Sequence, residues 1–109
     1  MSRNILNEAR DELIDMGLAR NEPEFCVAWL GRGVGYMRTL RHINQEPSAE
    51  ALGILASKLE HYTQRLWLAG EGRADWAARF DVLHQHCRAA LEQHARDRWQ
   101  EQGRMGYGS

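Results

Sequence analysis

Two consecutive stretches of this chain carry apolar side chains that recur at alternating steps of three and four residues. The first stretch runs from Leu52 to Ala69, and the second runs from Trp76 to His94. Such steps place side chains on one face of an α-helix. The short, glycine-containing segment 70–73 separates the stretches, and a turn of this length favours antiparallel neighbours. The sequence therefore predicts a long antiparallel helical hairpin.

The first half of the chain predicts shorter helices. Helical spacing covers residues 5–16, 22–30 and 34–43, and Ser48 is placed to cap the helix that carries the first apolar stretch. Strands are not expected, because no stretch alternates with a period of two and is rich in Val, Ile or Thr. We therefore expect an all-α fold, a bundle of four to five helices followed by the hairpin. Residues 103–109 are rich in glycine and lack periodicity, which predicts a flexible tail.

Composition bounds the class of protein. A chain of 109 residues, 43% hydrophobic and 27% charged, is typical of one globular domain. Its formal net charge of −1 gives no global attraction to nucleic acid or membranes. Cys26 and Cys87 are too few and too far apart for a disulfide framework, and no apolar leader or spanning segment is evident. We therefore expect a cytoplasmic protein with reduced thiols and no membrane contact.

One local charge asymmetry stands against this neutral background. Residues 25–45 contain Arg32, Arg38, Arg41 and His42 and no acidic residue. On a helical wheel with Met37, Leu40 and Ile43 turned inward, the outward positions are Val34, Gly35, Arg38 and His42, and Arg41 lies at the edge. An outward face with arginines suits the major groove of DNA, where arginine binds guanine or phosphate. A solvated basic face on an ordinary bundle is the plainer interpretation.

The order of these parts resembles the helix-turn-helix family of Cro and the lambda-type phage repressors, often called XRE-like. The resemblance is carried by PSAEALGILASKL at residues 47–59, because this family commonly has Pro-Ser-x-Glu-x-Leu, then Leu-Ala and another Leu, after its recognition helix. It covers about residues 5–62. The resemblance implies a helix-turn-helix domain at 1–62 with residues 34–43 as the recognition helix, and it leaves 63–102 as a hairpin extension.

From this resemblance and the basic face we expect a homodimeric protein that binds duplex DNA and regulates transcription. The expected DNA-binding residues are Arg32, Val34, Gly35, Arg38, Thr39, Arg41 and His42. Dimerisation is expected through the hairpin, because its apolar stripes are long for so small a domain and tryptophan is favoured at interfaces. The expected interface residues are Trp67, Trp76, Phe80, Leu83, Cys87, Leu91 and Trp99.

Two other classes of function remain open. A helical adaptor would keep the helix-turn-helix shape without DNA binding and use the hairpin tryptophans to bind another protein. A metal-assisted enzyme or sensor would use His61, His84 and Cys87, since residues three apart on a helix can reach one ion. None of the usual zinc spacings or catalytic motifs is present, so we expect no enzyme activity and no cofactor.

Overall fold

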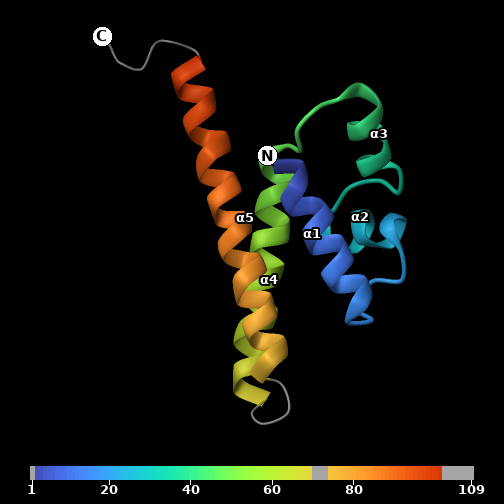
Figure 1. Ribbon diagram of the computed structural model, residues 1–109, viewed down its shortest axis with the longest axis vertical. Coiled ribbons are helices and arrows are strands. Elements are labelled where there is room, and N and C mark those ends of the chain that lie inside the picture. Colours follow the sequence, from blue (N-terminus) through green and yellow to red (C-terminus); the bar gives the residue numbers. More distant parts are fainter. Residues whose placement is uncertain (1, 70–73, 102–109) are drawn as a thin grey trace.

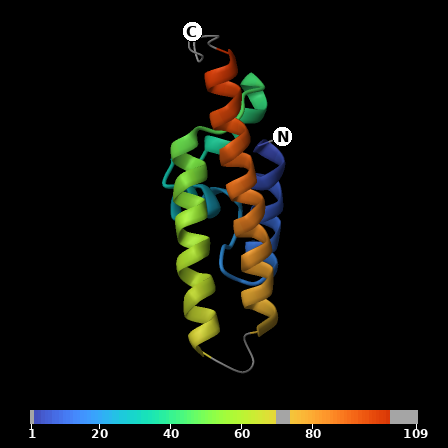
Figure 2. The same cartoon turned by 90° about the vertical axis from the view of Figure 1, so that its left-hand side faces the viewer.

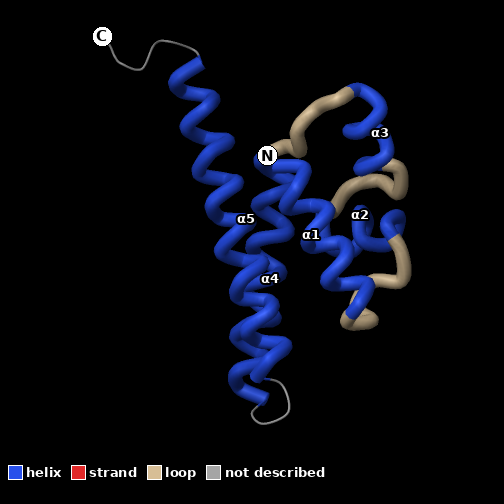
Figure 3. The backbone as a smooth tube through the Cα atoms, in the orientation of Figure 1, coloured by secondary structure: helices blue, strands red, loops and turns tan. Residues whose placement is uncertain are grey.

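The computed structural model describes residues 2–69 and 74–101, and this part of the chain is all-α, as the sequence predicts. Helices and connecting loops account for all of it, with no strand in the described ranges (Figure 3). The helices are listed here in chain order: α1 (Ser2–Asp15), α2 (Glu22–Leu30), α3 (Tyr36–Ile43), α4 (Ala49–Ala69) and α5 (Ala74–Glu101). The expected tail at 103–109 and the turn at 70–73 lie outside the described residues.

Helices α4 and α5 lie side by side and antiparallel, and they form the predicted hairpin (Figures 1 and 2). The Cys87 thiol in α5 donates a hydrogen bond of 3.2 Å to the Leu52 carbonyl in α4. Helix α4 continues without a break through Tyr62. The predicted boundary at 62 therefore falls inside a continuous helix, and the hairpin is built into the same helix that closes the N-terminal bundle.

Helix α1 packs along α5, so the hairpin and the N-terminal helices share one core (Figure 2). Phe80, Leu83 and Cys87 are buried within the single chain, in one cluster with side chains of α1, α2 and α4. In the single chain α1 and α4 already cover this apolar stripe, so these three side chains are not exposed for the expected dimer interface. Ion pairs border the same contact, with Arg79 of α5 bonded to Glu12 and Asp15 of α1.

Local sequence explains where α1 and α2 end. Gly17 has a positive φ of 77°, and the backbone N–H groups that follow it return to carbonyls of the last turn of α1. Asn21 caps α2 by accepting a hydrogen bond of 3.0 Å from the Glu24 backbone N–H. Gly31 ends α2 with φ 65°, the left-handed conformation that glycine adopts without strain.

Helix α3 is shorter than the sequence predicts. It begins at Tyr36 rather than at residue 34, because the preceding segment has two glycines and no side chain that caps the helix. Met37 and Leu40 are buried as expected, but Ile43 is 48% exposed although it was expected to face inward. Asn44 ends the helix with φ 55°, so Ile43 is the last residue of α3.

None of the helices within the described ranges is both long and apolar enough to cross a lipid bilayer.

Candidate nucleic-acid interface

Helix α3 stands away from the hairpin, and α2 is the described helix against which it packs (Figure 1). The connection between them is the short segment 31–35. One face of α3 is anchored in the core by Met37 and Leu40. The opposite face is exposed and includes Arg38, Thr39 and His42. The helix is therefore held on one side and left open to a large ligand on the other.

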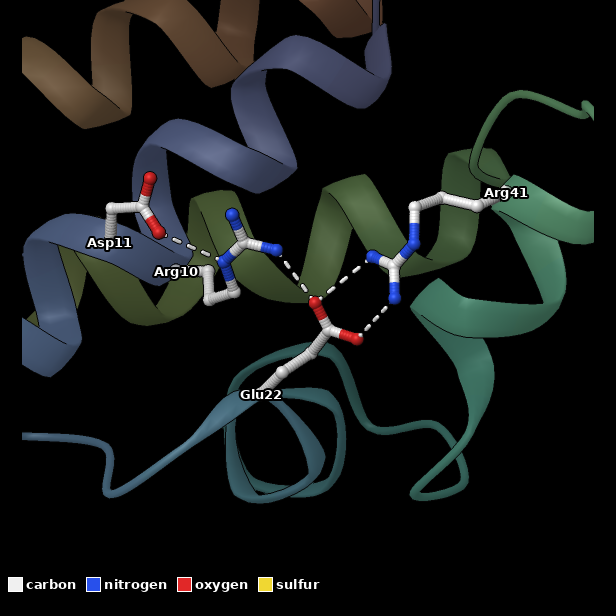
Figure 4. Close-up of polar contacts among 4 residues, drawn as sticks. All are labelled: Arg10, Asp11, Glu22 and Arg41. Atoms are coloured by element: carbon white, nitrogen blue, oxygen red, sulfur yellow. Dashed lines mark hydrogen bonds and ion pairs between the residues drawn. The ribbon is translucent and has the colours of Figure 1, made fainter.

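Arg41 is not free to contact a ligand, because Glu22 holds its guanidinium (Figure 4). The two side chains form parallel hydrogen bonds, 3.0 Å from Nη1 to Oε1 and 2.9 Å from Nη2 to Oε2. Arg10 of α1 donates a further bond of 2.6 Å to the same Oε1. These bonds, with those from Arg41 the stronger influence, hold the pKa of Glu22 below its ordinary value. Glu22 thus joins α1, α2 and α3 in one ionic cluster.

Arg32 is also engaged within the chain. Its Nη1 donates a hydrogen bond of 3.2 Å to Glu50 at the start of α4, and its guanidinium lies 5.4 Å from the centre of the Tyr36 ring. The Tyr36 hydroxyl in turn accepts a hydrogen bond of 3.0 Å from the backbone N–H of Ser48. The Glu50 side chain is 72% exposed, so this ion pair is readily exchanged for another anion.

Arg38 and His42 differ from these two arginines, because no carboxylate in the described part of the chain pairs with either of them. The Arg38 guanidinium lies back over the start of α3, where its Nη2 is 3.2 Å from the position that a Cβ on Gly35 would occupy. Val34 is 64% exposed in the loop before α3, and Gly35 is half-buried there. Among the three expected arginines, Arg32 and Arg41 are thus paired within the chain, and Arg38 has no carboxylate partner in the described ranges.

Three residues of this surface were not among those expected from the sequence, namely Glu22, Tyr36 and Glu50. Glu22 and Glu50 offset two of the three arginines, although both lie outside the acid-free segment 25–45. Local charge patterning does not reveal such pairs, because their members are separated by 18 and 19 positions in the sequence. The motif at 47–59 was the available signal for Glu50, since it places this residue at the start of a helix.

The remaining hairpin residues expected at a dimer interface fall into two groups. Trp76 and Leu91 are half-buried and pack against the core. Trp67 and Trp99 are 56% and 47% exposed and stand on opposite ends of the hairpin, near the end of α4 and the end of α5. The structure therefore leaves two separated tryptophans, rather than a continuous stripe, at the surface.

The histidines of the hairpin and Cys87 do not converge. Across 2–69 and 74–101, no group of three or more His, Cys, Asp or Glu side chains is arranged to hold a metal ion. His84 lies 3.8 Å from a Glu60 oxygen, and His86 is bonded to Glu8. Cys87 is buried, and burial raises the pKa of its thiol to about 11. This thiol therefore stays protonated at neutral pH.

The fold and this surface define an all-α protein whose third helix is presented on a short connection from the second. The chain belongs to a family of unknown function, DUF6626, whose model matches residues 6–100. No curated protein and no solved structure matches the chain.

Proposed function

We propose that this protein binds duplex DNA through the exposed face of α3, as a transcriptional regulator of the helix-turn-helix kind. The observation that carries the proposal is Arg38, an exposed arginine in the first turn of α3 without a carboxylate partner in the described part of the chain. A guanidinium in this position is suited to a phosphate or a guanine edge. The resemblance of residues 47–59 to the XRE-like family supports the same function.

In this proposal the three arginines have different roles. Arg38 is the proposed contact residue, with Thr39 and His42 beside it on the exposed face. Arg41 is a positioning residue, because its bidentate pair with Glu22 fixes α3 against α2. When DNA binds, Arg32 leaves the exposed Glu50 carboxylate and pairs with a phosphate instead.

The test is fluorescence anisotropy of a labelled mixed-sequence duplex at two salt concentrations, about 50 mM and 200 mM. The wild type is expected to bind at low salt and to weaken steeply at the higher salt, because bound phosphates release counterions. Arg38→Ala is expected to weaken binding at least about fivefold and to reduce the salt slope by about one. Arg88→Ala is the matched control, since Arg88 is an exposed arginine on α5. Absence of binding at low salt, or equal effects of both variants, would contradict the proposal.

A second candidate function is protein binding by the hairpin, either to a second copy of the chain or to another protein. Trp67 and Leu68, which are 56% and 88% exposed in the last turn of α4, favour it. Light scattering across a concentration series tests self-association, and Trp67→Ser with Leu68→Ser should abolish it. If the protein is a monomer at every concentration, self-association is excluded, and the partner of the hairpin must be a different protein.

A further inference from the structure

A hollow on the α2–α4 side of the bundle is lined mainly by apolar and aromatic side chains, unlike the basic surface of α3. Leu18, Ala28, Trp29, Lys58 and Tyr62 line it, and its volume is about 290 Å³. An apolar cavity of about 150 Å³ is enough for one benzene ring, so this hollow has room for one ring and a small polar group. Leu18 and Tyr62 are exposed at its edge, whereas Trp29 is buried beneath it.

The one charged group in this lining is the Lys58 ammonium. It donates a hydrogen bond of 2.6 Å to the Ala28 carbonyl in the last turn of α2. Its Nζ also lies 4.8 Å from the centre of the Trp29 ring and 6.0 Å from that of Tyr62. An ammonium carries three N–H donors, but these contacts supply only one hydrogen-bond acceptor, the Ala28 carbonyl, because the two rings are uncharged. Two N–H donors of Lys58 therefore have no acceptor among these contacts. No carboxylate in the described ranges forms an ion pair with it.

Two other hollows of similar size show the contrast. One lies between α1 and α5 and contains Arg79, which Glu12 and Asp15 already neutralise. Another contains His86, which is bonded to Glu8. In both, a carboxylate of the chain itself occupies the position next to the basic group. The hollow around Lys58 is thus an apolar recess with an uncompensated positive charge.

We propose that this hollow binds a small organic carboxylate with an apolar, ring-sized body. The carboxylate accepts hydrogen bonds from the free N–H groups of Lys58, and the ring packs on Leu18 and Tyr62. Charge complementarity selects an anion, and the limited volume selects a small molecule over a peptide. The inference does not depend on DNA binding, because the hollow and α3 share no residue.

Lys58 also has a structural role, since its bond to Ala28 supplies a donor to one of the last carbonyls of α2. A structural role alone predicts that Lys58→Met lowers the melting temperature and that the wild type binds no ligand. The proposed site predicts that the wild type binds the ligand and that the charge of Lys58 determines its affinity. Ligand binding is therefore the measurement that separates the two.

The experiment is a titration of ¹⁵N-labelled protein with phenylacetate, followed by amide chemical shifts and the Trp29 indole N–H. We expect saturable shifts confined to the hollow, with a dissociation constant on the order of 1 mM, as is typical of so small a ligand. Phenylacetamide, which has the same ring and no charge, and acetate, which has the charge and no ring, are expected to bind at least about tenfold more weakly. Equal binding of the amide, or no saturable shifts with phenylacetate, would overturn the proposal.

Three variants complete the test. Lys58→Arg keeps the charge and should keep binding, Lys58→Met should lower affinity at least about tenfold, and Arg88→Met is the matched control that should not change it. Unchanged affinity in Lys58→Met overturns the proposal. If circular dichroism finds Lys58→Met unfolded, Leu18→Glu replaces it, because Leu18 is an exposed residue of the rim. Loss of binding in Leu18→Glu supports the site, and retained binding overturns it.

Discussion

Glu22 and Arg41 face each other through two parallel hydrogen bonds of 3.0 and 2.9 Å, so the first residue of α2 holds the last turn of α3. The contact fixes the angle between the two helices on which the proposed function depends. It also occupies one of the arginines that local sequence assigned to DNA. This pair therefore links the stability of the fold to the properties of the proposed interface.

Glu22→Gln should lower the melting temperature by a few degrees at neutral pH, because a charged bidentate pair becomes a weaker neutral contact. The pKa of Glu22 is lowered, chiefly by its hydrogen bonds with Arg41, from an ordinary value of 4.5. Its contribution to stability is therefore present above pH 4.5 and is lost as the pH falls through the lowered value. Melting curves should converge for wild type and variant in acid. Glu50→Gln is the control with an exposed carboxylate, and a constant difference at all pH values would contradict the assignment.

Leu83→Ala should destabilise the monomer by about 2–5 kcal/mol, the range for a fully buried leucine that leaves a cavity. Leu83 is 1% exposed within the single chain, so the loss should be equal at low and high protein concentration. Urea unfolding at two concentrations measures it. Val82→Ala, at the exposed neighbouring position, should change stability little. A loss that depends on protein concentration would return Leu83 to an interface.

Two glycines should respond in opposite directions to alanine. Gly31 has φ 65°, and a Cβ there would lie 2.9 Å from the Ile54 Cδ1, so Gly31→Ala should lose about 1–2 kcal/mol. Gly53 lies inside α4 with nothing within 4 Å of its Cβ position, so Gly53→Ala should gain about 0.5–1 kcal/mol. Thermal and urea unfolding measure both. Changes of the same sign would show that the end of α2 is not built as described.

Cys87 should resist thiol reagents in the native protein. Burial raises its pKa to about 11, and its thiol donates a hydrogen bond to the Leu52 carbonyl. Because the folded value exceeds the ordinary value of 9.0, its contribution to stability is complete below pH 9.0 and is lost as the pH rises towards 11. Reaction with DTNB at about pH 8 should be negligible until denaturant is added. Rapid reaction of both Cys26 and Cys87 in the native state would contradict their burial.

Local sequence was sufficient for the helices and for most of their ends. Apolar spacing located the hairpin, and Ser48 was identified as the cap of α4, because a helix cap joins residues close in the chain. The start of α3 was harder to predict from the sequence. Gly33 and Gly35 neither favour a helix nor form a side-chain cap, and the helix begins only at Tyr36.

Contacts between distant residues account for what the sequence did not reveal. The stripe through Phe80, Leu83 and Cys87 has the same spacing whether α1 of the same chain or a second copy covers it, so periodicity alone assigned it to a dimer. In the candidate site, the pairing of Arg41 with Glu22 depends on how α2 and α3 cross. The absence of acidic residues between positions 25 and 45 therefore led to an overestimate of the unpaired positive charge on this surface.

The measurement that tests the central proposal most directly is a titration of ¹⁵N-labelled protein with mixed-sequence duplex at low salt. The proposal predicts that the largest amide shifts fall on residues 38–42 and on the segment 31–35, with the hairpin end at Trp67 unaffected. Raising the salt should reverse these shifts. Shifts centred on the hairpin, or no shifts at low salt, would contradict DNA binding by α3.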